Sequence, residues 1–195
     1  MVDWEKILLT KLSQNAILGA ETPKLGAAAV LVPIGVRHGA TQQEILLTKR
    51  TAQVETHKGQ ISFPGGFFEV SDPSLLATAL RETYEEVGLT QNQLEILGPL
   101  KPVQTLRDVM IYPWVARVQF PQEFQLSLRE VERTLFLPLE RLLKEGLQPV
   151  RVAVQKQGAT FHIESMGIEC DRELIWGASA KILEQLYLYL KEEPF

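Results

Sequence analysis

Three glutamates close together are the residues of this sequence best suited to chemistry. Glu82, Glu85 and Glu86 lie within the segment RETYEEVG. At about 100° per residue, a helix places their side chains in one sector about 100° wide, while Leu80 and Val87 fall on the opposite side. Three crowded carboxylates repel one another, so a cation is favoured among them, and Mg²⁺ or Mn²⁺ prefers such oxygen ligands. The alternative is a solvated acidic face on a surface helix.

A glycine pair precedes these glutamates and is interpreted as a turn. Gly65 and Gly66 follow Phe-Pro, and a glycine backbone can approach a ligand closely or direct a carbonyl at a metal ion. A helix is predicted from Pro73 to Val87, with Asp72 as its cap and Gly88 at its end. Free amides near a helix N-terminus can hold a phosphate oxygen. A metal ion and an anionic ligand are therefore both expected here.

The remaining chain predicts strands and helices without a regular alternation. Strands are expected at 27–36, 44–48, 60–63, 94–97, 111–120 and 132–137, with a hairpin from 150–155 and 160–164. Helices are expected at 139–144 and 177–190, and an amphipathic helix within 1–20. This order favours an α/β chain of α+β type, with a mixed sheet between helices. Residues 1–195 are expected to form one domain.

Composition excludes several classes of protein. The chain has 195 residues and a formal net charge of -4, with no broad basic field for a nucleic acid. No apolar run is long enough to span a bilayer, so no membrane partner is expected. A single cysteine, Cys170, rules out an internal disulfide framework and fits a reducing compartment. The expected location is therefore the cytoplasm.

The segment from 63 to 89 resembles a Nudix box, G-x5-E-x7-R-E-U-x-E-E-x-G-U with U aliphatic. The matching residues are Gly66, Arg81, Glu82, Glu85, Glu86, Gly88 and Leu89. Three departures occur: Asp72 replaces the first glutamate, the spacer to Arg81 has one extra residue, and Thr83 stands at an aliphatic position. Asp72 and Glu69 are both candidates for the first box carboxylate.

A second segment resembles the pattern of the coenzyme A diphosphatase branch, LLTxR-[SA]-x3-R-x3-G-x3-FPGG. The chain reads LLTKRTAQVETHKGQISFPGG from Leu46, and matches at Leu46, Leu47, Thr48, Arg50, Gly59 and Phe63 to Gly66. Thr51 stands where serine or alanine is usual. Glu55 stands where the pattern has arginine, which reverses a charge that could serve the 3′-phosphate of CoA.

The resemblance implies a mixed Nudix sheet between helices and metal-dependent cleavage of a diphosphate. Glu82 and Glu86, one helical turn apart, are the leading metal ligands, and Glu85 is a third ligand or an orienting carboxylate. Arg81 is expected to hold the carboxylates in place. Gly65 or Gly66 is a candidate for a backbone carbonyl ligand.

The general base is not fixed by the box. Glu130 is a candidate, and its alternative is a solvated or capping glutamate. The candidates for contacts with substrate phosphates are Lys49, Arg50, His57, Lys58 and the backbone of Gly65.

Three functions remain open at this point. The leading one is a Mg²⁺- or Mn²⁺-dependent hydrolase of CoA or acyl-CoA, giving adenosine 3′,5′-bisphosphate and (acyl-)4′-phosphopantetheine. A second keeps the chemistry but acts on an ADP-sugar, NADH or an oxidised nucleotide, and Glu55 favours it. A third is a binding module with the same fold and no turnover, and a homodimer is possible in each case.

Overall fold

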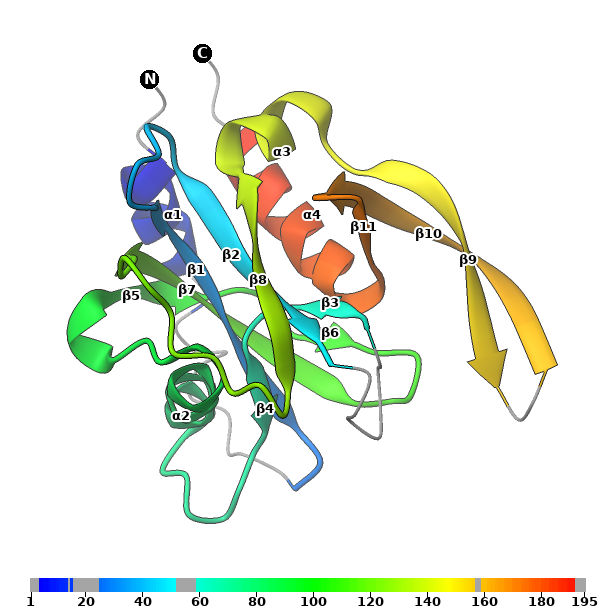
Figure 1. The fold of residues 1–195 in the computed structure, drawn as a ribbon, viewed down its shortest axis with the longest axis horizontal. Coiled ribbons are helices and arrows are strands. Elements are labelled where there is room, and N and C mark those ends of the chain that lie inside the picture. Colours follow the sequence, from blue (N-terminus) through cyan, green and yellow to red (C-terminus); the bar gives the residue numbers. More distant parts are fainter. Residues whose placement is uncertain (1–3, 14, 16–24, 52–58, 157–158, 192–195) are drawn as a thin grey trace.

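The computed structural model describes residues 4–13, 15, 25–51, 59–156 and 159–191 (Figure 1). The elements in chain order are α1 (Trp4–Ser13), β1 (Ala28–Val36), β2 (Glu44–Arg50), β3 (Ile61–Ser62), β4 (Gly65–Phe67), α2 (Leu75–Val87), the 3₁₀ turn η2 (Gln91–Gln93), β5 (Leu94–Pro99), β6 (Val103–Gln104), β7 (Met110–Gln119), β8 (Val131–Pro138), α3 (Leu139–Glu145), β9 (Gln148–Lys156), β10 (Ala159–Cys170), β11 (Glu173–Trp176) and α4 (Gly177–Lys191).

A mixed eight-stranded sheet forms the centre of the fold. Its strand β1 is almost wholly apolar and pairs in parallel with β7, from Ala28 opposite Ile111 to Val36 opposite Gln119. Strands β2 and β4 pair with β1 in the antiparallel sense. A strand buried on both faces needs a continuous apolar run, which explains the sequence of β1.

Helices cover both faces of this sheet. Because side chains alternate along a strand, Val30 and Val32 of β1 join the apolar cluster formed with α1, α3 and α4. Leu31 faces the other way and joins the cluster that includes Val87 of α2. Among the α-helices of the described residues, α2 therefore lies on one face, with α1, α3 and α4 on the other (Figure 1). The predicted α+β sheet between helices is confirmed.

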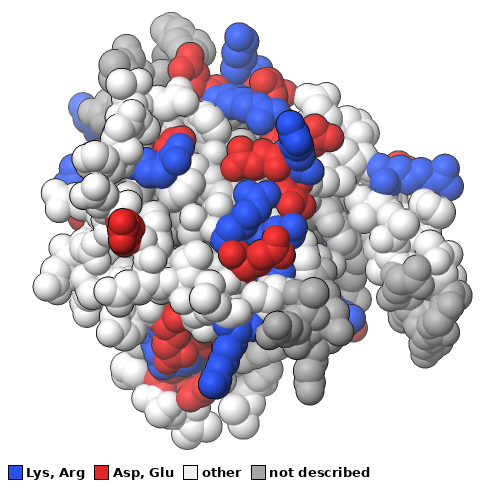
Figure 2. All heavy atoms as spheres, viewed as in Figure 1, with Lys and Arg blue, Asp and Glu red and all other residues white. Residues whose placement is uncertain are grey.

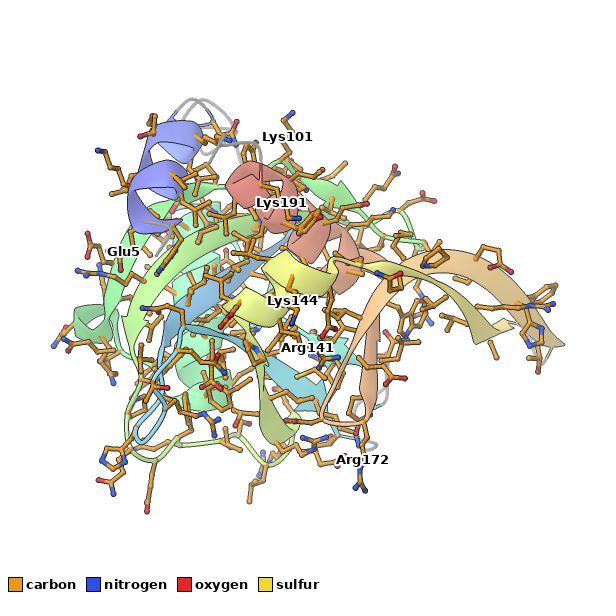
Figure 3. The ribbon with its side chains drawn as sticks, turned by 90° about the horizontal axis from the view of Figure 1, so that it is seen from above. Glu5, Lys101, Arg141, Lys144, Arg172 and Lys191 are labelled. Carbon is orange, nitrogen blue, oxygen red and sulfur yellow. The ribbon has the colours of Figure 1, made fainter. Side chains whose placement is uncertain are left out.

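A second sheet, of three strands, carries a long hairpin away from the body. Strands β9 and β10 form this hairpin and β11 pairs with the base of β10 (Figure 1). Figure 3 shows the same projection from above, beside the labelled side chains Arg141 and Lys144 of α3. Cys170 at the end of β10 is buried in the larger core, which agrees with its small apolar character.

The sequence predicted most of these elements, including the short strand β3 within 60–63, and missed three others. Strands β4, β6 and β11 were not expected, since two to four residues carry little periodicity. None of the helices in the described parts of the chain could span a membrane. On the face drawn in Figure 2, acidic and basic side chains interleave instead of forming a field of one sign.

Candidate active site

Helix α2 is held at both ends by local hydrogen bonds. The side chain of Ser74 accepts a hydrogen bond from the Ala77 amide at 3.1 Å, so Ser74 is the N-cap. Gly88 ends the helix with a φ of 74°, and its N–H donates to the Tyr84 carbonyl. The predicted start of the helix at Pro73, with Asp72 as its cap, is therefore wrong. A tertiary contact of Asp72 explains the difference.

The Asp72 carboxylate pairs with Arg81, which lies nearly two turns into α2. The Arg81 guanidinium donates to both carboxylate oxygens, from Nε at 2.9 Å and from Nη2 at 3.0 Å. The Thr78 hydroxyl and the Glu69 amide also donate to Asp72, at 2.9 and 3.1 Å. The Arg81 hydrogen bonds are the main cause that lowers the pKa of Asp72 to about 2. Of the two candidates for the first box carboxylate, Asp72 is the one that pairs with Arg81.

Arg81 also links this aspartate to the glutamates of the helix. Its Nη1 lies 2.9 Å from Oε1 of Glu82 and 3.5 Å from Oε2 of Glu85. Its Nη2 donates to the Phe67 carbonyl at 3.2 Å. Hydrogen bonding to Asp72, followed by Glu82, raises the pKa of Arg81. The arginine therefore fixes the helix against the loop that precedes it.

The three glutamates do not share one exposed face. The exposed fractions of the side chains are 57% for Glu85, 15% for Glu82 and 2% for Glu86. The expectation that all three carboxylates lie on one face opposite the buried face is therefore wrong, and the alternative of a solvated acidic face fits Glu85 alone. Glu86 points from α2 toward the sheet and is buried there. Glu82 is partly buried, and this burial is the main cause that raises its pKa.

Glu86 is a buried carboxylate between two motifs. Its Oε2 accepts a hydrogen bond from the Gly65 amide at 3.4 Å, and its Oε1 lies 3.5 Å from Nη1 of Arg50. Burial raises the pKa of Glu86 to about 8, and the nearby negative charges of Glu82 and Glu130 act in the same direction. The Nε of Arg50 is itself buried and has no hydrogen-bond partner among the described residues. Arg50 thus has donor capacity left for a ligand.

The glycine pair lies in strand β4 and not in a turn, which corrects the prediction. Gly65 has a φ of 151°, and a Cβ there would lie 2.3 Å from the Ala29 carbonyl oxygen of β1. A Cβ on Gly66 would lie 2.4 Å from Cδ of Glu82. The first glycine therefore permits strand pairing, and the second lets the Glu82 carboxylate approach the backbone.

Glu130 lies close enough to this cluster for its charge to raise the pKa values of Glu82 and Glu86. It belongs to a turn that contacts α2, where the Ser127 amide donates to the Glu86 carbonyl at 3.0 Å. The turn also contacts the end of β2, through Thr51. No periodic pattern in the sequence predicts these two contacts, and Thr51 stands out there only as a departure from the branch pattern.

Not every candidate phosphate ligand lies at this cluster. Lys49 and Arg50 are successive residues of a strand, so their side chains leave on opposite faces. Arg50 reaches Glu86, but Lys49 forms ion pairs with Glu132 at 3.2 Å and Glu173 at 2.9 Å. The structure therefore does not bring Lys49 to the carboxylates of α2. His57 and Lys58 lie outside the described residues, as does Glu55.

The donor set fits a hard divalent cation, although Arg81 and Arg50 already contact Glu82 and Glu86. In the described ranges, no group of three or more His, Cys, Asp or Glu side chains is arranged to hold a metal ion. Mg²⁺ does not require such a cage, since it commonly binds through one or two carboxylates, several waters and substrate phosphates. Glu82 and Glu86 supply those carboxylates, and the missing side chain of Gly66 lets the Glu82 carboxylate lie against the backbone of β4.

Comparison with known proteins identifies this arrangement. The model of the NUDIX domain family matches residues 27–156. The chain belongs to the Nudix family. It is thus a hydrolase of a diphosphate bond in a nucleoside diphosphate derivative, and enzymes of this family generally need divalent metal ions. The match covers the central sheet and α2, while α1 and α4 outside it pack into the same core.

Relatives and solved structures agree with this assignment. The chain is 32% identical over 178 residues to a protein of Citrobacter koseri named "Uncharacterized Nudix hydrolase NudL", covering 91% of this chain and 89% of that one. The protein of the same name from Salmonella newport is 33% identical, with coverage of 89% and 88%. A C. elegans Ap4A hydrolase complex has a TM-score of 0.50 at 25% identity, covering 60% of this chain and 83% of its own. A MutT/nudix family protein of Enterococcus faecalis has a TM-score of 0.51 at 15% identity, with coverage of 93% and 71%, and supports the fold alone.

Proposed function

We propose that this Nudix hydrolase cleaves the diphosphate of CoA or acyl-CoA. The products would be adenosine 3′,5′-bisphosphate and (acyl-)4′-phosphopantetheine. One observation supports this choice above others. Arg50 of the LLTKR segment and Gly65 of FPGG both contact Glu86 of the box helix. The segment that resembles the CoA branch thus meets the carboxylates at one point, where a diphosphate would lie.

Each residue of the site would then have a separate role. Glu82 and Glu86 would hold Mg²⁺ or Mn²⁺, with Glu85 as an exposed further carboxylate. The metal ion, when bound, neutralises charge on the diphosphate and activates water. Arg50 would donate to a phosphate oxygen through its partly exposed guanidinium beside Glu86. Arg81 would keep the carboxylates in place, because it already bonds Asp72 and Glu82.

Glu130 would act as the general base. Its carboxylate is exposed, which leaves it accessible to a water molecule, and it lies near Glu82 and Glu86, the two more buried glutamates of the RETYEE segment. A positioned base commonly contributes about 10²- to 10⁴-fold to a rate. Glu130→Gln should therefore lower kcat by about that factor while Mn²⁺ binding persists, as measured by titration calorimetry. Unchanged turnover would assign the base to another residue.

A second substrate class keeps the same chemistry. The C. elegans neighbour is an Ap4A hydrolase, which is a hydrolase of a dinucleotide. Glu55, where the CoA pattern has arginine, also favours a substrate without a 3′-phosphate. A binding module without turnover is disfavoured, because the carboxylates Glu82, Glu85 and Glu86 of the box are all present and loss of catalysis would be expected to affect them.

Product analysis by liquid chromatography and mass spectrometry tests these choices. The protein would be incubated with CoA, acetyl-CoA, NADH, ADP-ribose and Ap4A in Mg²⁺ or Mn²⁺. The inactive control is Glu86→Gln, and the matched control is Glu140→Gln, an exposed carboxylate on α3. Adenosine 3′,5′-bisphosphate from CoA, lost only in Glu86→Gln, is the expected result. Preferential cleavage of another substrate would refute CoA and keep the chemistry, and no cleavage at all would favour the binding module.

A further inference from the structure

A single threonine joins the end of β2 to the turn that carries Glu130. Thr51 is buried, and its hydroxyl donates to the Arg129 carbonyl at 2.9 Å. Its backbone N–H donates to the Glu130 carbonyl at 2.9 Å. Two successive carbonyls of one exposed turn are therefore held by one buried residue. Since Thr51 directly follows Arg50, the same strand end also supplies the guanidinium beside Glu86.

The other side of this turn is held by α2. The Ser127 amide donates to the Glu86 carbonyl at 3.0 Å. Within the turn, the amides of Glu130 and Val131 donate to the Ser127 carbonyl at 2.9 and 2.8 Å. The backbone from 127 to 131 is thus fixed between the metal-ligand helix and the strand that carries Arg50.

This double attachment acts against an electrostatic force. Glu130 is exposed, and it shares the site with the carboxylates of Glu82 and Glu86. When these groups are ionised their like charges repel, so an unattached turn would carry Glu130 into solvent and away from the site. The two hydrogen bonds from Thr51 resist such a displacement, since breaking them would leave the donors of a buried residue unpaired.

We propose that Thr51 is a positioning residue whose hydroxyl holds the 127–131 turn in register, so that Glu130 remains at the reacting diphosphate. The proposal rests on the proposed role of Glu130 as general base. The proposal also distinguishes the residues that the branch pattern allows at position 51. Serine would preserve the hydrogen bond to the Arg129 carbonyl, and alanine would lose it.

Two substitutions at this position separate the hydroxyl from the packing. Thr51→Val keeps the shape and removes the donor, and Thr51→Ser keeps the donor. With the preferred diphosphate substrate, Thr51→Val should lower kcat by about 10- to 100-fold, because small misplacements of a catalytic group have effects of this size. KM and the calorimetric Mn²⁺ affinity should change by less than about 3-fold, and Thr51→Ser should restore kcat. Unchanged kcat in Thr51→Val would overturn the proposal.

A double-mutant cycle asks whether Thr51 acts through Glu130. In the Glu130→Gln background, Thr51→Val should cause no further loss of kcat, because the group that it positions is gone. Losses that multiply would show that Thr51 stabilises the site by another route, and would overturn the proposal. Full activity of Glu130→Gln alone would overturn it as well.

Hydrogen exchange keeps the proposal testable without turnover. If the wild type cleaves no diphosphate, the proposed function fails, but the attachment of the turn is still measurable. The amides of Ser127 and Glu130 should exchange at least about 10-fold faster in Thr51→Val than in Thr51→Ser, because local opening becomes easier. Equal exchange in the two variants would overturn the proposal independently of any activity.

Discussion

Replacing Glu86 by glutamine is expected to stabilise the metal-free protein at neutral and alkaline pH. The buried Glu86 carboxyl keeps its proton up to a pKa of about 8, whereas its ordinary value is 4.5. The unfolded chain therefore releases this proton at lower pH than the folded protein does. Rising pH then favours unfolding, so the stability present below pH 4.5 is lost progressively as the pH rises to about 8.

The size of this effect follows from the shift in pKa. Each pKa unit corresponds to about 1.36 kcal/mol. Between pH 5 and pH 8 the wild type should lose about 3 to 4 kcal/mol of unfolding free energy relative to Glu86→Gln, whose side chain stays neutral. This is a large part of the total stability of a typical domain.

Urea unfolding in the presence of a chelator, repeated at several pH values, measures the difference. Glu85→Gln is the matched control, because Glu85 is exposed on the same helix. The unfolding free energy of this variant should change with pH in parallel with that of the wild type. Added Mn²⁺ should restore the wild type at pH 8 and leave Glu86→Gln unchanged. Parallel curves for wild type and Glu86→Gln would refute the reasoning, since they would show that Glu86 ionises as easily in the folded state as in the unfolded one.

Other substitutions test the supports of the site. Asp72→Asn should lower the unfolding free energy by about 2 kcal/mol at pH 7, and the difference should vanish as the pH falls from 4 to 2, because Arg81 lowers the pKa of Asp72 to about 2; a constant difference at every pH would contradict this. Gly66→Ala should weaken Mn²⁺ binding by at least about 10-fold in calorimetry with little change in Tm, because its Cβ would displace Glu82. Gly65→Ala should instead lower Tm strongly in thermal unfolding, since its Cβ would meet the backbone of β1. Equal effects of the two glycine substitutions on Tm would argue against their separate roles.

Local patterns predicted the central elements well. The apolar run 27–36 became β1, and the closing helix predicted at 177–190 became α4. Both predictions rest on neighbouring residues alone, through the burial pattern of one strand and the apolar stripe of one helix. The same local signal placed the end of α2 at Gly88, where the left-handed conformation suits glycine.

The contacts that shape the site were beyond such patterns. Asp72 has the chemistry of an N-cap, but its carboxylate is taken by Arg81, nine positions later. Ser74 caps the helix in its place. Likewise, the helical wheel put Glu86 beside Glu85, yet the position of α2 on the sheet buries one and exposes the other. Sequence spacing gives the angle between side chains, and only tertiary packing decides which angle faces solvent.

The parallel pairing of β1 with β7 has a consequence for how the protein is made. Ala28 of β1 pairs with Ile111 of β7, which lies much later in the chain. This pairing therefore closes a long loop and is expected to form slowly. During synthesis α2 leaves the ribosome before β7 exists, because chains emerge from the N-terminus. The apolar cluster that takes up Val87 needs Ala116 and Val118 of β7. The carboxylates of α2 are therefore synthesised before the strand that encloses the helix. A nascent chain stalled after α2 and before β7 would expose the edge of β1 that pairs with β7.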